Sequence, residues 1–135
     1  MDAPKDMQAL AKQMMARAYA PYSKFAVGAA LRGANGKLYG GCNVENVAYS
    51  ESCCAESSAI SAMVADGERR IAEVVVMAKA DDPVTPCGGC RQRLREFAGD
   101  DVRIYFCDPS GTRGMKMMGE LLPHSFGPSH LNVKP

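Results

Sequence analysis

Two short motifs constrain the fold most strongly, Cys-Ala-Glu at residues 54–56 and Pro-Cys-Gly-Gly-Cys at residues 86–90, because their side chains suit one metal site. The two cysteines of the second motif are three residues apart and therefore share one face of a helix. Cys54 and Glu56 are two residues apart, so they converge only where side chains fan around the start of a helix. A helix N-terminus also favours thiolate over thiol. The sequence therefore predicts two helices that begin at a shared metal site.

The chemistry of this site follows from its residue types. Cys54, Cys87 and Cys90 supply three thiolates, which leaves the fourth position of a tetrahedral zinc ion open, as in catalytic zinc sites. Water at an open position loses a proton near neutral pH. Glu56 is the predicted catalytic residue, a carboxylate that moves protons between that water and a substrate. Cys-x-Glu followed by Pro-Cys-x-x-Cys is typical of zinc-dependent deaminases, so we expect one Zn²⁺ per chain.

A structural zinc module without enzymatic activity is the alternative from another class. Such a module needs a fourth protein ligand. Cys53 is adjacent to Cys54 and does not easily join the same tetrahedron, while Cys42 and Cys107 lie in predicted strands. The sequence alone therefore leaves this alternative open.

Size and charge restrict the partners and the location. The chain has 135 residues, which indicates one domain over residues 1–135. Sixteen basic and 15 acidic residues give a net charge of +1, which argues against a nucleic-acid partner. The sequence contains no apolar run of membrane-spanning length, and the N-terminus lacks the apolar core of a signal peptide. We therefore expect no membrane partner and a cytoplasmic location, where cysteines stay reduced.

The pattern of apolar residues and turn signals predicts an α/β chain. The expected elements, in order, are a helix at 2–20, strands at 26–31 and 37–42 joined by an Asn-Gly turn, a helix at 54–66, a strand at 71–78, a helix at 87–97, and strands at 102–106 and 115–118. Strand–helix–strand units imply parallel pairing with helices that cover the sheet. The expected sheet is mixed and five-stranded. The polar stretch at 43–50 is either a solvated loop or a substrate-binding segment.

Five segments resemble the small, homotetrameric, zinc-dependent cytidine deaminases. They are Ala-Pro-Tyr-Ser-Lys-Phe at 20–25, Gly-Cys-Asn-Val-Glu-Asn at 41–46, the two motifs described above with Arg91 and Gln92 added, and Glu-Leu-Leu-Pro-His-Ser-Phe at 120–126. The resemblance covers nearly the whole chain. The five segments occur in the same order and with the same spacing as in that family. It implies a three-layer cytidine deaminase-like fold and hydrolytic deamination of cytidine and deoxycytidine to uridine and deoxyuridine, with release of ammonia. It also implies a homotetramer with shared active sites.

The same resemblance implies a set of substrate-binding residues. They are Phe25, Asn43, Glu45, Ala48, Tyr49, Ala55, Pro86 and Phe126. Asn43 and Glu45 would bind the ribose. Phe25, with Phe126 from another subunit, would flank the base. Ala48 and Tyr49 would reach the sugar from a neighbouring subunit, and the main chain at Ala55 and Pro86 would contact the edge of the pyrimidine.

One residue departs from the family pattern. The family usually has arginine directly after Cys-Ala-Glu, where this chain has Ser57. An arginine there offsets the negative charge of the thiolates, and serine donates at most a neutral hydrogen bond. We predict that Arg91, one residue after Cys90, compensates for this charge. Deaminases of blasticidin S have a similar motif and also depart from arginine, so another aminopyrimidine nucleoside remains an alternative substrate.

Overall fold

A single mixed β-sheet organises the chain in the computed structural model, which describes residues 1–134. Its strands are β1 (Val27–Gly33), β2 (Leu38–Cys42), β3 (Ile71–Ala78), β4 (Arg103–Asp108) and β5 (Gly111–Met117), in the order β2-β1-β3-β4-β5. The β3–β4 pair is parallel and the other pairs are antiparallel. The predicted mixed five-stranded sheet is therefore confirmed. The end of the predicted domain, residue 135, lies outside the described residues.

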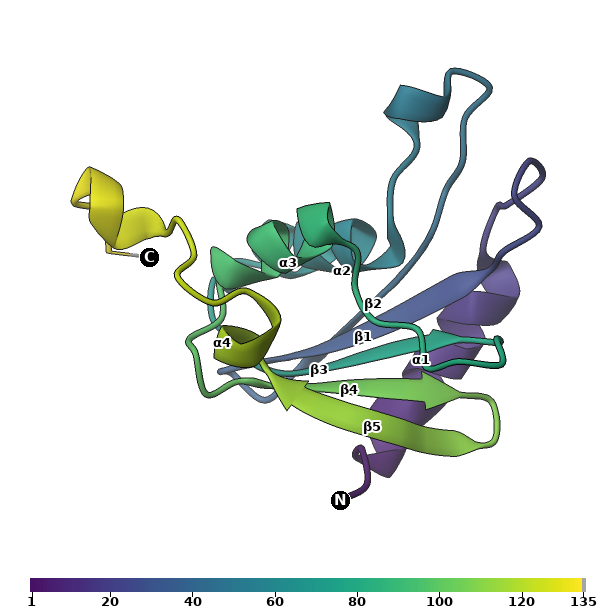
Figure 1. Cartoon of the computed structure of the whole chain (residues 1–135), viewed down its shortest axis with the longest axis horizontal. Coiled ribbons are helices and arrows are strands. Elements are labelled where there is room, and N and C mark those ends of the chain that lie inside the picture. Colours follow the sequence, from purple (N-terminus) through teal and green to yellow (C-terminus); the bar gives the residue numbers. More distant parts are fainter. Residues whose placement is uncertain (135) are drawn as a thin grey trace.

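Helices cover both faces of the sheet and make three layers (Figure 1). Helix α1 (Lys5–Arg17) lies on one face, while α2 (Ala55–Ala65) and α3 (Gly88–Arg95) lie on the other. Side chains of a strand alternate between faces, so Val74 and Val76 pack toward α2 and α3 whereas Val75 and Met77 pack toward α1. The side chains of β3 thus belong to two apolar clusters, one on each face of the sheet. This explains why consecutive residues of β3 are apolar. The predicted three-layer α/β fold is confirmed.

Two glycines bring the helices unusually close to the sheet. A Cβ atom at Gly28 would lie 2.0 Å from the carbonyl oxygen of Ala11, and one at Gly41 would lie 2.3 Å from the backbone nitrogen of Ala59. Neither distance leaves room for a side chain, so α1 and α2 rest directly on the backbone of β1 and β2. The contact at Gly41 fixes the height of α2 above the sheet. It thereby positions the start of α2, where the first metal-binding motif lies.

Two elements differ from the sequence-based expectation by three or more residues at a boundary, and the others that differ do so by one or two. The first helix occupies 5–17 instead of 2–20, because Pro4 has an extended backbone (ψ 137°) and Ala18 leaves the helix at ψ 142°. The last strand occupies 111–117 instead of 115–118. The turn before it is closed by Asp108, whose carboxylate accepts hydrogen bonds from the N–H groups of Ser110 and Gly111, so pairing with β4 begins immediately.

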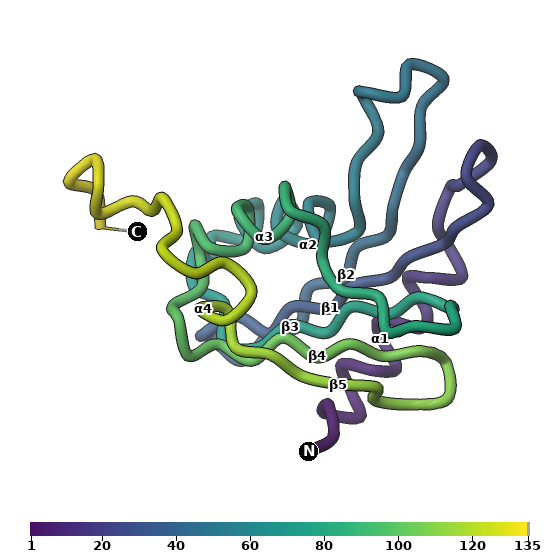
Figure 2. The backbone as a smooth tube through the Cα atoms, in the orientation of Figure 1, coloured from purple at the N-terminus to yellow at the C-terminus, as the bar shows by residue number. Residues whose placement is uncertain are grey.

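Two segments project from the layered body (Figure 2). Residues 43–53 form an arm that contains a short 3₁₀ turn, η1 (Tyr49–Glu51), and Val44 and Cys53 close its base with two backbone hydrogen bonds. Residues 122–134 form a tail on the opposite side, which follows α4 (Met118–Leu121) and contains η2 (Pro128–Leu131). Within the described residues, each helix is too short or too polar to cross a bilayer.

Candidate metal centre and substrate pocket

Three cysteine sulfurs converge where α2 and α3 begin. Cys54 immediately precedes α2, Cys87 immediately precedes α3, and Cys90 lies in the first turn of α3. The three sulfurs all lie within 4.8 Å of one another, and those of Cys54 and Cys87 are 3.9 Å apart. Tetrahedral zinc with bonds of about 2.3 Å holds its thiolates about 3.8 Å apart. The predicted start of two helices at one site is confirmed, and the separation of the sulfurs fits zinc.

The donor set is also electrostatically suited to a cation. Burial raises the pKa of Cys90, and the neighbouring Glu56 and thiols raise it further. Burial likewise raises the pKa of Cys54. Burial opposes ionisation of Cys87 as well, but the backbone N–H of Cys90 and the adjacent thiols hold its pKa below the ordinary value. Three thiolates this close repel one another, so a divalent cation is the group that allows all three to ionise.

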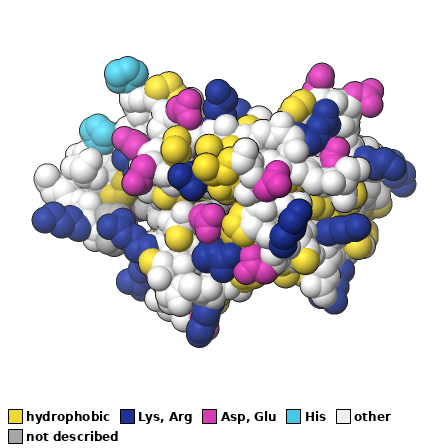
Figure 3. Space-filling view, turned by 90° about the horizontal axis from the view of Figure 1, so that it is seen from below, with side chains coloured by type: hydrophobic (Ala, Val, Ile, Leu, Met, Phe, Trp, Pro, Cys, Tyr) yellow, Lys and Arg dark blue, Asp and Glu magenta, His cyan; other side chains and the backbone are white. Residues whose placement is uncertain are grey.

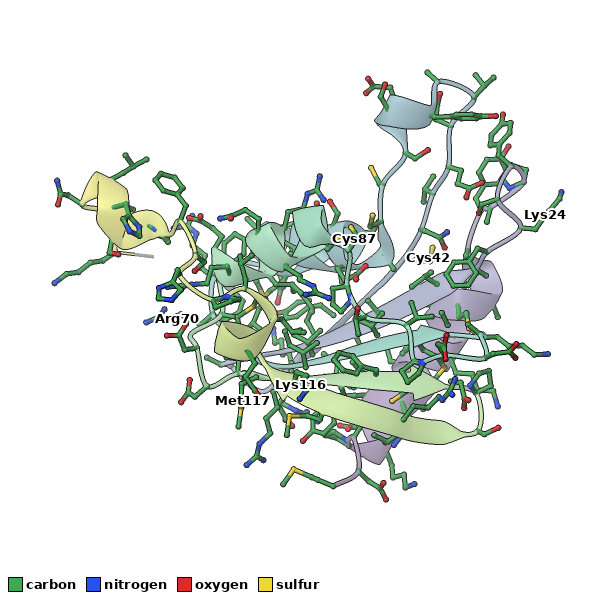
Figure 4. All side chains as sticks on the ribbon, viewed as in Figure 1. Lys24, Cys42, Arg70, Cys87, Lys116 and Met117 are labelled. Atoms are coloured by element: carbon green, nitrogen blue, oxygen red, sulfur yellow. The ribbon has the colours of Figure 1, made fainter. Side chains whose placement is uncertain are left out.

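No fourth protein ligand joins the sulfurs within residues 1–134, where the cluster of potential ligands consists of the three cysteines alone. Cys42 and Cys107 lie in β2 and β4, and Cys53 is exposed on the arm. Figure 4 shows Cys42 on its strand below Cys87, which lies at the start of α3. A structural zinc module requires four protein ligands, so this arrangement favours an open, catalytic type of site.

Glu56 is the one buried charged residue among residues 1–134, with 4% of its surface exposed. Its position one residue into α2 places the carboxyl group beside the thiols without making it a metal ligand. Burial raises the pKa of this carboxyl group, although its own backbone N–H, Cys90 and Arg93 partly oppose the shift. A carboxyl group with a raised pKa gains and releases protons closer to neutral pH, which suits general acid–base chemistry.

A cavity of about 330 Å³ opens beside the metal centre. Its lining includes Phe25, Asn43, Glu45, Cys54, Glu56 and Cys87. Cavities of this size hold one small organic molecule. Ala55 also lines the cavity, and neighbouring loops together with Val27 of β1 and Val76 of β3 supply the remaining wall. The structure therefore brings four of the sequence-predicted substrate-binding residues, the predicted catalytic glutamate and two predicted zinc ligands to one cavity.

The polar side chains of this cavity are held by the loop at residues 20–26. The Glu45 carboxylate accepts hydrogen bonds from the N–H groups of Tyr22 and Ser23 at 2.9 and 3.1 Å, and from the Ser23 hydroxyl. The Ser23 hydroxyl lowers the pKa of Glu45, with help from those two N–H groups. Glu45 is therefore ionised at neutral pH and presents a hydrogen-bond acceptor to the cavity.

Four of the predicted substrate-binding residues lie outside this cavity in a single chain. Ala48 and Tyr49 are exposed on the arm, and Tyr49 packs against Tyr22 with ring centroids 5.7 Å apart. Phe126 is exposed on the tail, stacked on His130 at 5.3 Å. Pro86 is buried next to Cys87, and its carbonyl oxygen accepts a hydrogen bond from Arg91. Their roles stay predictions.

The predicted role of Arg91 is wrong. Its guanidinium donates to the carbonyl oxygens of Pro86 and Leu121, at 2.8 and 3.0 Å, and to the Thr85 hydroxyl at 3.0 Å. These bonds turn it toward the loop before α3 and toward α4. The cation at the thiols is Arg93, whose Nη1 lies 3.7 Å from the sulfur of Cys90. Sequence adjacency favoured Arg91, whereas the three-residue spacing of Cys90 and Arg93 on one helix face was the informative signal.

The comparisons with known proteins agree with this site. A family model described as the cytidine and deoxycytidylate deaminase zinc-binding region matches residues 1–107. A cytidine deaminase from Sporosarcina psychrophila is 41% identical over 132 residues, which cover 98% of this chain and 96% of the relative. One from Halalkalibacterium halodurans is 38% identical over 94% of this chain and 98% of the relative. The crystal structure of cytidine deaminase from Burkholderia pseudomallei superposes with a TM-score of 0.86 at 36% identity, covering 92% of this chain and 99% of that one.

Proposed function

Since this chain belongs to the cytidine and deoxycytidylate deaminase family, we propose that the site at α2 and α3 hydrolytically deaminates cytidine and deoxycytidine. Water replaces the 4-amino group of the base, so the products are uridine or deoxyuridine and ammonia. The observation that carries the proposal is the buried carboxyl group of Glu56 beside three convergent thiols in a cavity that accepts one small molecule.

Cys54, Cys87 and Cys90 would hold one zinc ion per chain. Their sulfurs have the separation that tetrahedral zinc requires, and the site leaves a coordination position for a water molecule. Zinc in such a site supplies Lewis acidity, which makes a coordinated water acidic near neutral pH.

Glu56 would carry the protons of the reaction. Its carboxylate takes one proton from the attacking water and delivers it to N3 of the ring. It then takes the second proton of that water, which is now on the C4 hydroxyl group, and passes it to the 4-amino group, so that the C4–N bond breaks and ammonia leaves. The same group acts first as base and then as acid, which requires a pKa that is not far below neutral. The burial of Glu56, which raises its pKa, supports this assignment.

The nucleoside would be oriented by residues on the other side of the cavity. The ionised Glu45 and the Asn43 amide would bind ribose hydroxyls, while Phe25 would lie against the base. The main chain at Ala55 and Pro86 would contact the pyrimidine edge. Ala55 lies on the cavity wall, which supports its placement, and Pro86 directly precedes Cys87, which also lines the cavity.

We further propose that the active form is a homotetramer with shared sites. The large apolar residues of the arm and tail are highly exposed in one chain: Val47 76%, Tyr49 74%, Leu131 68% and Phe126 59%. Exposed apolar surface of this kind marks an interaction site. The arm and the tail project from opposite sides (Figure 1), which supports the proposal. Each would reach a neighbouring subunit's cavity, with Ala48 and Tyr49 at the sugar and Phe126 at the base.

The free thiols and the surface charge support the remaining assignments. All six cysteines are unpaired, which suits the reducing cytoplasm that we propose as the location. Basic and acidic side chains are interspersed on the face shown in Figure 3, which suits a small-molecule substrate better than a nucleic acid.

A substrate comparison tests the proposal. Purified protein is assayed for ammonia release from cytidine, deoxycytidine, free cytosine and blasticidin S. We expect turnover of both nucleosides and far slower turnover of cytosine, because cytosine lacks the sugar that Asn43 and Glu45 would bind. Turnover of blasticidin S alone would replace the proposed substrate but keep the reaction, and no ammonia from any of the four would overturn the proposal.

A further inference from the structure

The guanidinium of Arg93 contacts the metal centre from α3. Nη1 of Arg93 lies 3.7 Å from the sulfur of Cys90, which is itself fully buried. Within residues 1–134, this is the one hydrogen bond between a cationic side chain and a sulfur of the three-cysteine cluster. Arg91 is nearer in sequence, but it is occupied by Pro86, Leu121 and Thr85.

The neighbouring glycine leaves space for this contact. A Cβ atom at Gly89 would lie 3.2 Å from Nη1 of Arg93, tighter than an ordinary contact, whereas a Cβ at Gly88 would meet nothing within 4 Å. The Arg93 side chain therefore folds back along α3 over Gly89 to reach Cys90. Side chains of helical residues point toward the N-terminus, which makes this direction the natural one.

The first turn of α2 supplies no comparable group. Ser57 follows Glu56 directly, and within the described part of the chain its hydroxyl makes no hydrogen bond to a thiol. The N-terminal ends of α2 and α3 contribute partial positive charge at best. Arg93 is thus the full positive charge placed against the ligands.

Charge balance shows what such a cation does. Three thiols that bind Zn²⁺ release three protons, so a neutral site becomes a site of net charge −1. A fixed positive charge in contact with one sulfur stabilises the zinc-bound site relative to the protonated, metal-free site. A hydrogen bond to a thiolate also withdraws electron density from the sulfur–metal bond.

We propose that Arg93 is a positioning residue of the metal centre, which stabilises the bound zinc by donating a charged hydrogen bond to the Cys90 thiolate. This inference rests on the proposed function, because it requires that the three cysteines hold zinc. It assigns to α3 the positive charge that offsets the three thiolates.

Zinc affinity tests the inference without reference to turnover. The apparent Kd for Zn²⁺ is measured at neutral pH and low ionic strength, by competition with a chromophoric chelator, for wild type, Arg93→Gln and Arg93→Lys. Glutamine keeps a neutral donor and lysine keeps the charge. Arg69→Gln is the matched control, because it removes the same charge from an exposed residue before β3. We expect about tenfold weaker binding in Arg93→Gln, an intermediate value in Arg93→Lys, and the wild-type value in the control.

The cobalt-substituted proteins give an independent, spectroscopic readout. Replacing the charged donor with a neutral one weakens the hydrogen bond and raises the energy of the sulfur lone pairs. The sulfur-to-cobalt charge-transfer band of Arg93→Gln should therefore move to longer wavelength, and that of Arg93→Lys should return toward wild type. Wild-type affinity together with an unshifted band in Arg93→Gln would overturn the inference. The proposed function would fail separately, if wild-type protein that binds zinc released no ammonia from any of the four compounds.

Discussion

The Asn43 side chain clamps the backbone on both sides of Ala26. Its Oδ1 accepts a hydrogen bond from the N–H of Val27 at 2.8 Å, and its Nδ2 donates to the carbonyl oxygen of Phe25 at 2.8 Å. The clamp ties the loop that carries Phe25 to the end of β2. A residue proposed to bind the ribose therefore also positions the ring proposed to lie against the base.

Asn43→Ala should impair substrate binding more than chemistry. Removing both bonds leaves a part-buried N–H and a carbonyl oxygen without partners and releases Phe25, a loss of about 1–3 kcal/mol. We expect kcat/KM for cytidine to fall about 10- to 100-fold, mainly through KM, while zinc content stays at the wild-type level. Asn43→Asp keeps the acceptor for Val27 and should be less impaired. A selective fall in kcat would show that Asn43 acts on the reaction itself.

Two cysteine variants, one inside the sulfur cluster and one outside it, provide a sharp test of the ligand set. Cys87→Ala removes one of the three convergent sulfurs, so purified protein should lose most of the single zinc ion that the wild type carries. Cys53→Ala changes an exposed cysteine next to Cys54 that lies outside the sulfur cluster, and it should keep full zinc content. Elemental analysis of the two variants measures this directly. Full zinc in Cys87→Ala would remove that residue from the ligand set.

An ion pair between α1 and β1 should make stability depend on pH. The Arg32 guanidinium donates to both carboxylate oxygens of Asp6, at 2.9 and 3.0 Å, and holds the pKa of Asp6 below its ordinary value of 3.8. A lowered pKa in the folded state stabilises the fold above the unfolded-state pKa, and this contribution disappears as pH falls through the folded-state pKa.

Asp6→Asn should therefore be less stable than wild type at pH 7 and indistinguishable from it well below pH 3.8. Because Asp6 is largely exposed, the difference at pH 7 should be about 0.5 kcal/mol. Urea unfolding of both proteins at the two pH values measures it, with Asp82→Asn on an exposed loop as the control. A difference that persists or grows at low pH would show that the ion pair is not its cause.

Shared active sites predict that two defective subunits complement each other. Glu56→Gln removes the proton carrier, and Phe126→Ala removes the ring proposed to cap a neighbour's cavity. In mixed oligomers, some cavities combine Glu56 from one subunit with Phe126 from the other. We expect activity at low substrate concentration to exceed the sum of the separate variants after dissociation and reassembly, and sedimentation to show a tetramer. Purely additive activity would contradict the shared-site arrangement.

The sequence predicted the layered fold well because its signals were local. The run at Ile71–Ala78 was correctly assigned as a buried strand, since both faces of β3 are covered. The metal motifs placed two helix starts at one point, because cysteine spacing and helix geometry together leave few alternatives. The last strand was underestimated, since β5 lies at the edge of the sheet and has few buried residues to reveal its periodicity.

The candidate site was less predictable where several segments meet. Adjacency to Cys90 favoured Arg91. However, the Arg91 guanidinium donates hydrogen bonds to the carbonyl oxygens of Pro86 and Leu121, two residues that are distant from each other in sequence. Tyr49 and Phe126 lie on the arm and the tail, outside their own chain's cavity. Their predicted roles depend on neighbouring subunits.

We propose that Glu56 transfers protons beside a zinc ion during deamination of cytidine. The most direct test compares ammonia release from cytidine by wild type and Glu56→Gln, with the zinc content of each protein measured in the same preparation. Glutamine keeps the shape of the side chain and cannot carry the proton. We expect one zinc ion per chain in both proteins and a fall in kcat of at least about 10²-fold in the variant. A zinc-loaded variant within about twofold of wild type would show that another group moves the proton.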